Sequence, residues 1–345
     1  MNHADISSAE RQILTDVGAE FGLAAMRVVG PLGGTASPKW AVETPQGRFV
    51  IRRRPAEFAG RGATHFDHVM LGRLASAGLP VPRPVPRPDG STTLHHEGGV
   101  YEVLAWVEGD PFVEGDPQAI AGIATFLARF HQTLTGDVPP GKEGQLREEH
   151  PDRLTPYLAD LYMRAGGQSV ERQLDALAEQ LQLVRDQLDG GPYDSLPHGV
   201  IHGDVHPGNF RFRGGEVTAV YDFDYLGVQA QVRDVSDAVM FFASRRDSPL
   251  EPNRIQSLTQ AFVPDLDRSR QLLERYTSRR PLVESEWQAL PWLVRSRWLQ
   301  MRLRGSRKVP GEEKVPFVLN RFFEVINWLD REAEPFFGRL RAAVE

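Results

Sequence analysis

The chain has 345 residues, more than one hydrophobic core usually carries, so two lobes or domains are expected. Hydrophobic residues make up 41% and charged residues 25%, and the mean hydropathy is −0.37, which excludes disordered, collagen-like and polytopic membrane proteins. The net charge of −6 disfavours a nucleic-acid-binding protein, and the absence of cysteine excludes disulfide scaffolds, thiolate zinc sites and cysteine nucleophiles.

No apolar stretch reaches the roughly 20 residues that a membrane span requires. The N-terminus mixes acidic and polar residues, whereas a signal peptide has basic residues followed by an apolar block. We therefore expect a cytoplasmic protein that binds neither nucleic acid nor membranes. Its oligomeric state is not indicated.

The first third of the chain reads as one helix followed by strands. Ser7 to Glu10 resembles a capping box, and apolar residues follow at helical spacing until Gly22. The strand-like segments are 26–29, 39–43, 48–53 and 101–107, with a glycine-rich turn at 30–35. A second helix is predicted over 65–77, and proline at every other position makes 80–88 an extended connector.

After residue 110 the pattern becomes helical. Asp116 and Pro117 form a helix start, another amphipathic helix covers 170–188, and helices resume near Asp234 and run to the end. Pro291 is expected to start or kink one of them. A small strand-rich lobe joined near 106–110 to a larger helical lobe is an α+β architecture.

The chemistry-bearing stretch is V-I-H-G-D-V-H-P-G-N-F at 200–210, followed by V-T-A-V-Y-D-F-D at 217–224. Two apolar runs flank a polar loop, and a strand–loop–strand hairpin would bring Asp204, Asn209 and Asp222 together. Phosphoryl transfer needs such groups: one carboxylate orients the attacking hydroxyl, while an amide and a second carboxylate offer oxygen ligands to Mg²⁺.

The H-x-D…N spacing and the later Asp-Phe match the protein-kinase pattern. H-G-D-x-H-P-G-N followed by D-F-D-Y resembles the superfamily of aminoglycoside phosphotransferases, choline kinases and type II homoserine kinases. The resemblance covers about residues 20–245. It implies a bilobal protein kinase-like fold, with residues 1–106 as a small antiparallel β-sheet N-lobe that binds nucleotide. Residues 107–345 would be the larger, mostly helical C-lobe with the catalytic loop and acceptor site.

The resemblance implies an ATP-dependent phosphotransferase that moves the γ-phosphoryl group of Mg·ATP to a hydroxyl of a small-molecule acceptor. Asp204 would be the catalytic base, Asn209 and Asp222 would hold Mg²⁺, and Asp224 would bind a second ion. ATP would lie against the backbone from Leu104 to Val107.

The phosphates of ATP would lie under Gly33 and Gly34 and against Arg52. Kinases of this type normally pair a strand Lys with a helix Glu. We predict that Arg52 and Asp67 replace that pair here, because the longer cation compensates for the shorter acid.

Four alternatives stay open. A stress-response Ser/Thr protein kinase would have the same fold, and a catalytically silent nucleotide-binding module would share its cleft. A metal-dependent hydrolase would use His202, Asp204 and His206, although both histidines fit a structural role in the loop better. N-capping is the simpler interpretation of Asp234 and Asp237.

Six cations lie within fourteen residues near the C-terminus, and a solvated helix face is the simpler interpretation. If they line the acceptor cleft, they argue against a polycationic aminoglycoside and for a substrate with a carboxylate or phosphate. They are Arg295, Arg297, Arg302, Arg304, Arg307 and Lys308.

Overall fold

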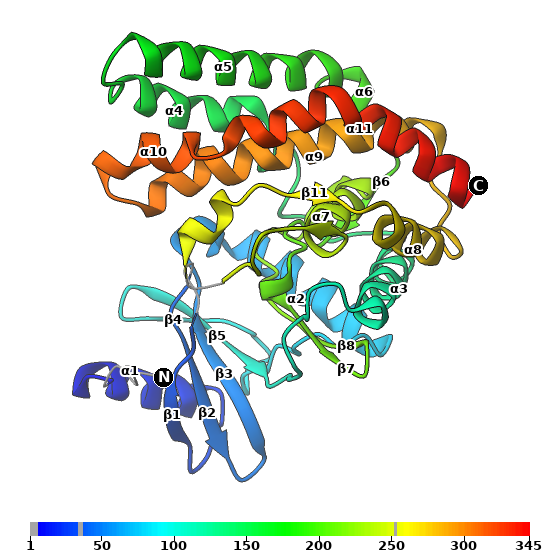
Figure 1. The fold of residues 1–345 in the computed structure, drawn as a ribbon. Helices are drawn as coiled ribbons and strands as arrows, with labels where there is room; N and C mark the ends of the chain where they lie inside the picture. Colours follow the sequence, from blue (N-terminus) through cyan, green and yellow to red (C-terminus); the bar gives the residue numbers. More distant parts are fainter. Residues whose placement is uncertain (1–5, 34–36, 252–253) are drawn as a thin grey trace.

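The computed structural model describes residues 6–33, 37–251 and 254–345. In the N-terminal part, five antiparallel strands form one sheet in the order β1-β2-β3-β5-β4 (Figure 1). They overlap all four predicted strand segments and add one short strand. Their bounds are β1 (Arg27–Pro31), β2 (Lys39–Thr44), β3 (Gly47–Arg53), β4 (Leu94–His96) and β5 (Gly99–Ala105).

The two faces of this sheet differ in chemistry because successive side chains of a strand alternate between them. One face packs against α1 (Ser8–Glu20), and its buried row across three strands is Trp40, Ile51 and Val103. The neighbouring row lies on the other face, toward the rest of the molecule, and consists of Lys39, Arg52 and Glu102. The sheet therefore presents charged side chains to the helical part of the molecule.

Two capping signals placed helix starts correctly, whereas the second predicted helix begins four residues earlier than expected. Ser7 caps α1 by accepting a hydrogen bond from the Glu10 backbone, and Asp116 caps α3 (Pro117–Thr133) in the same way. The second predicted helix is α2 (Arg61–Ser76). The extended connector over 80–88 is also confirmed, and it runs beside β5 through the Pro84–Leu104 bridge.

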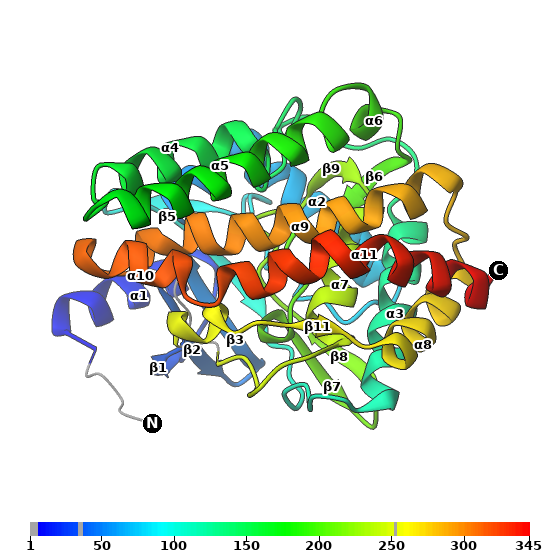
Figure 2. The same ribbon diagram turned by 45° about the horizontal axis from the view of Figure 1, so that its top comes forward.

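The larger part of the molecule is helical and contains the main hydrophobic core. Figure 2 shows α4, α5, α9 and α11 as a layer of long helices over α7 and the short strands. The remaining helices are α4 (Pro151–Tyr162), α5 (Gln168–Leu188), α6 (Gly191–Asp194), α7 (Val232–Phe242), α8 (Leu266–Thr277), α9 (Glu284–Gly305), α10 (Lys314–Leu319) and α11 (Phe322–Val344). Pro291 lies inside α9 and does not start it.

The predicted hairpin around residues 200–221 is wrong in its pairing. β6 (His198–Ile201) pairs with β9 (Gly227–Ala230), and β7 (Phe210–Arg213) pairs with β8 (Glu216–Val220). Gly214 and Gly215 both have positive φ and form the two-residue turn that closes β7 onto β8. Two short ribbons therefore hold the polar loop between them. A last pair, β10 (Ser244–Arg245) and β11 (Val263–Pro264), follows α7.

None of the helices in the described ranges is long and apolar enough to cross a membrane.

Candidate active site

The polar loop 202–209 connects β6 to β7, and its two histidines hold its backbone. The buried His202 ring contacts the Tyr221 carbonyl at 3.0 Å and accepts a hydrogen bond from the Asp204 amide at 3.3 Å. His206 accepts a hydrogen bond from the Gly208 amide at 3.1 Å. These contacts confirm the structural role of both histidines. Within the described ranges, no group of three His, Cys, Asp or Glu side chains is placed to hold a metal, so the hydrolase alternative has no support.

Asp234 anchors the same loop from α7. Its carboxylate accepts hydrogen bonds from the backbone amides of His202 at 2.7 Å and Gly203 at 2.9 Å. The predicted N-cap role of Asp234 is therefore wrong, since Gln231 occupies the N-cap position. Gly203 has φ 79°, and a Cβ there would lie 2.5 Å from the Tyr225 carbonyl oxygen, which explains why glycine precedes Asp204.

Asp204 is held by three side chains. Arg297 donates to one carboxylate oxygen at 2.6 Å, and the Asn209 amide donates to the other at 3.2 Å. His206 lies 3.3 Å from that second oxygen. Burial opposes ionisation, but His206 and Arg297 outweigh it and keep the pKa of Asp204 well below its ordinary value. Asp204 is therefore a fixed, ionised carboxylate.

Asp222 follows β8 and lies next to Asn209, because the Tyr221 amide donates to the Asn209 carbonyl at 2.8 Å. Its φ of 59° is unusual for aspartate. Burial and the neighbouring Asp224 raise the pKa of Asp222, and its buried Oδ1 accepts no hydrogen bond in the part of the chain that the structure describes. The Arg52 guanidinium lies 3.6 Å from this oxygen. A carboxylate oxygen left without a donor fits a metal ligand.

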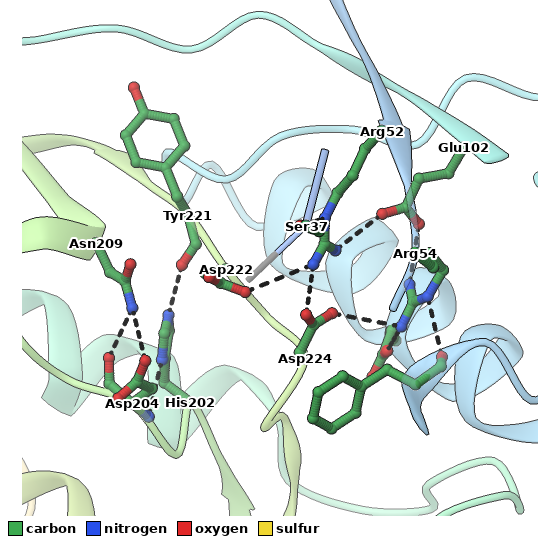
Figure 3. Close-up of polar contacts among 12 residues, drawn as sticks. Ser37, Arg52, Arg54, Glu102, His202, Asp204, Asn209, Tyr221, Asp222 and Asp224 are labelled. Carbon is green, nitrogen blue, oxygen red and sulfur yellow. Dashed lines mark hydrogen bonds and ion pairs between the residues drawn. The ribbon is translucent and has the colours of Figure 1, made fainter. Parts of the chain in front are cut away.

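The Asn209 amide group offers a second ligand. Its nitrogen is turned to Asp204, which leaves its oxygen on the opposite side (Figure 3). The structure thus brings Asp204, Asn209 and Asp222 into one group, as the spacing predicted. Asp224 lies behind them, buried and paired with Arg52 and, at 3.7 Å, with Arg54.

The predicted pairing of Arg52 with Asp67 is wrong. Arg52 donates to Ser37 at 2.9 Å, to Glu102 at 3.0 Å and to Asp224, as Figure 3 shows. Asp67 on α2 instead pairs with Arg54 at 2.5 Å and with Lys142 at 2.6 Å. The short aspartate side chain meets the arginine two residues further along, and Glu102, directly across the sheet from Arg52, takes its place.

Lys39 was missed in the sequence. It lies opposite Arg52 on the same face of the sheet, is half-buried, and makes no hydrogen bond or ion pair with any described residue. Burial lowers its pKa, and Asp222 is the strongest opposing charge. Its position on the strand before the predicted phosphate-binding arginine was the available signal.

The other residues predicted to contact the nucleotide lie along β5, after it and after β1. Leu104 pairs with Val50 in the sheet, and the Val107 carbonyl accepts a hydrogen bond from the Tyr221 hydroxyl at 2.8 Å. Gly33 is exposed just after β1, whereas Gly34 lies outside the described residues. These assignments remain predictions.

The cations near the C-terminus are not a solvated helix face. Arg295, Arg297, Arg302 and Arg304 are all buried, because α9 packs between α5, α7 and α11 in the centre of the helical part. Each has partners: for example, Arg302 donates to the backbone carbonyls that end α10. Only Arg307 and Lys308, just after α9, are exposed.

Arg297 also reaches a second carboxylate. Asp237 is buried on α7, 3.3 Å from the Arg297 Nε, and neither of its oxygens accepts a hydrogen bond from a described residue. Burial raises the pKa of Asp237 to about 7, against the opposing charge of Arg297. Arg297 therefore connects Asp204 to a second buried acid.

A pocket of about 210 Å³ opens beside Asp204. Its apolar wall includes Phe241, Leu250, Ile255, Leu258 and Met301. Its charged lining consists of Asp204, Glu251, Arg254, Arg297, Arg304, Arg307 and Lys308. Part of the predicted cation cluster thus lines the space next to Asp204.

The chain is similar to a family of phosphotransferases and to homoserine kinases. The profile described as "Phosphotransferase enzyme family" matches residues 28–272. The homoserine kinase of Polaromonas naphthalenivorans (strain CJ2) is 26% identical over 274 residues, 78% of each chain. That of Rhodopseudomonas palustris (strain BisA53) is 27% identical over 282 residues, 81% of this chain and 79% of its own.

Solved structures confirm the bilobal protein kinase-like fold. An amicoumacin kinase in complex with AMP-PNP, Ca²⁺ and Ami has a TM-score of 0.66 at 15% identity, covering 96% of this chain and 97% of its own. A microcompartment-associated aminopropanol kinase has a TM-score of 0.67 at 19% identity, covering 94% and 98%. The choline kinase of Cryptosporidium parvum Iowa II has a TM-score of 0.60 at 11% identity, covering 96% and 99%.

Proposed function

The chain belongs to the phosphotransferase enzyme family, and we propose that its loop 202–209 transfers the γ-phosphoryl group of Mg·ATP to a hydroxyl of a small molecule. Residues 1–106 would form the nucleotide-binding lobe and residues 107–345 the catalytic and acceptor-binding lobe. The observation that carries the proposal is the group of Asp204, Asn209 and Asp222, in which one buried Asp222 oxygen lacks a donor among the described residues.

In the proposed reaction, Asp204 accepts a hydrogen bond from the acceptor hydroxyl and orients its oxygen toward the γ-phosphorus. The oxygen–phosphorus bond forms, the bond to the β-phosphate oxygen breaks, ADP leaves, and the hydroxyl proton passes to Asp204. A low pKa makes Asp204 a weak base, which suits a loose transition state in which positioning matters most.

Asp222 and the amide oxygen of Asn209 are the groups that would hold Mg²⁺, which neutralises phosphate charge. Asp224 is the weaker candidate for a second ion, because two arginines already pair with it. Leu104 and Val107 would flank the adenine.

We expect Asp222→Asn to weaken Mg·ATP binding by at least tenfold. The variant removes the negative charge of the proposed metal ligand, whose buried Oδ1 accepts no hydrogen bond from a described residue. Calorimetry with a non-hydrolysable ATP analogue, with Mg²⁺ or with EDTA, measures the effect. Asp247→Asn, on the surface beside Arg321, is the matched control. Unchanged affinity would remove Asp222 from the metal site.

We expect Lys39→Met to raise the KM for ATP by at least tenfold, since one charge-assisted hydrogen bond contributes roughly 1.5–3 kcal/mol and about 1.4 kcal/mol corresponds to a factor of ten. The folded state should lose little stability, because Lys39 has no ion pair with a described residue. Steady-state kinetics and a thermal melt test both statements. The control is Arg53→Met, which changes an exposed cation at the end of β3, next to Arg52. An unchanged KM would mean that Lys39 does not meet the phosphates.

The experiment that tests the function as a whole is an ADP-release screen with Mg·ATP across amino alcohols, amino acids, sugars and aminoglycosides. Turnover that depends on a small acceptor supports the proposal. Labelling of the protein itself without an acceptor would favour the protein-kinase alternative. A thermal shift with Mg·ATP but no turnover on any acceptor would indicate a catalytically silent module.

A further inference from the structure

The pocket beside Asp204 differs in charge from the chain as a whole. The chain carries a net charge of −6, yet five of the seven charged side chains that line this pocket are cations. Its volume of about 210 Å³ is also small compared with pockets for drug-sized ligands, which measure about 300–1,000 Å³. Size and charge together favour a small ligand that is not a polycation.

The cations of this pocket are not equally engaged by the protein. Arg297 pairs with Asp204 and Asp237, and Arg254 pairs with Glu251 at 3.3 Å. Arg304 pairs with Glu148 and lies 5.2 Å from the ring of Tyr225. These three arginines are therefore already partly neutralised.

Arg307 is different. It is exposed in the pocket lining, immediately after α9, and forms no hydrogen bond or ion pair with any residue in the described ranges. Arg304 and Lys308 lie beside it, and burial together with the charge of Arg307 lowers the pKa of both. Three neighbouring cations repel one another, and a bound anion would offset that repulsion.

We propose that the acceptor is a small hydroxyl compound with one anionic group, a carboxylate or a phosphate monoester, and that Arg307 binds this anion while Asp204 orients the hydroxyl. Lys308 lines the same pocket, interacts electrostatically with Asp204, and adds positive charge beside Arg307. A guanidinium binds carboxylate and phosphate oxygens in bidentate fashion. This inference rests on the proposed phosphotransferase function.

Matched acceptor pairs test the inference by ADP release. L-Homoserine is compared with 3-aminopropan-1-ol, which lacks the carboxylate, and glycerol 3-phosphate is compared with glycerol; kanamycin represents the polycations. We expect a preference of at least tenfold in kcat/KM for an anionic member. The two pairs distinguish carboxylate from phosphate. A preference for the uncharged or cationic member overturns the inference.

Two variants of Arg307 assign the anion to this residue. Arg307→Gln should raise the KM for the preferred anionic acceptor by at least tenfold, and Arg307→Glu should abolish the preference within the pair. The KM for ATP should stay unchanged in both. Arg331→Gln, exposed on α11, is the matched control. An equal loss on both members of a pair would show that Arg307 acts on the phosphoryl group instead, which also overturns the inference.

Binding measurements separate this inference from the proposed function. Calorimetry with each acceptor, in the presence of Mg²⁺ and a non-hydrolysable ATP analogue, reports acceptor binding without turnover. Absence of binding by both anionic probes, in a protein that binds the nucleotide, overturns the anionic acceptor alone. Failure to bind Mg·ATP overturns the proposed function itself.

Discussion

Replacement of Asp204 by Asn is expected to lower kcat by about two to four orders of magnitude, the range typical of a positioned acid or base. The side-chain amide keeps the size of the carboxylate. An NH₂ group can, however, replace the oxygen that accepts the hydrogen bond from the hydroxyl of the substrate. Single-turnover and steady-state kinetics with Mg·ATP measure the change. The affinity for the nucleotide should change far less than kcat, because the variant leaves Asp222 in place and none of the side-chain partners of Asp204, which are Arg297, Asn209 and His206, lies on the sheet proposed to bind ATP.

Asp222→Asn supplies the internal comparison, since it should change nucleotide affinity where Asp204→Asn changes turnover. A thermal melt of the Asp204 variant excludes unfolding, which matters because Arg297 loses the charge of one of its two acidic partners. Wild-type turnover in Asp204→Asn would refute the assigned role of Asp204.

The second large effect is expected on stability. Glu102 is almost completely buried. Its carboxylate contacts two guanidinium groups, Arg52 at 3.0 Å and Arg54 at 2.9 Å, and the imidazole of His68 at 2.7 Å. Glu102→Gln should lower the free energy of unfolding by about 3–5 kcal/mol, because it removes the acid that the two buried arginines Arg52 and Arg54 share and leaves the cluster with one negative charge fewer. Denaturant unfolding followed by circular dichroism measures the loss.

Glu43→Gln is the matched control, since Glu43 also meets two arginines, Arg27 and Arg48, on the same sheet but at the surface. Its loss should stay below about 1 kcal/mol. Equal losses in the two variants would contradict the importance of the buried cluster.

The same site predicts a pH dependence. Burial disfavours the ionised form of Glu102, but Arg54, His68 and Arg52 outweigh it and hold its pKa well below the ordinary 4.5. A carboxyl with a lowered folded pKa contributes stability above its unfolded pKa and loses it as the pH falls toward the folded pKa. The Gln variant should therefore lose less stability than the wild type between about pH 5 and pH 3.

Features encoded by local spacing were predictable. Ser7 and Asp116 mark helix starts through caps that involve only neighbouring residues. The loop from His202 to Asn209 was recognisable because its chemistry lies within eight residues. The convergence of Asp222 with that loop was also predicted, although the hairpin from which it was predicted is wrong: β8, which ends just before Asp222, pairs with β7 and not with β6.

Features that depend on tertiary packing were not predictable in the same way. α9 carries charged residues on two opposite sides, so its pattern resembles a solvated helix, although its central place in the helical part buries it. The partner of Arg52 depends on the register between β3 and β5, which no local signal specifies. The role of Asp234 depends on α7 meeting a loop about thirty residues earlier in the chain.

The ion pairs between the sheet and the helical part have a consequence for how the enzyme handles nucleotide. Arg52 and Arg54 reach across to Asp224, and Lys142 returns to Asp67 while donating to the Asp224 and Leu226 carbonyls at 2.9 and 2.6 Å. Swinging the two halves apart would strip these buried charges of their partners, at a cost of several kcal/mol for each one. The spacing between the sheet and the helical part is thus preset, and the groups proposed to react need not be assembled by closure of the halves.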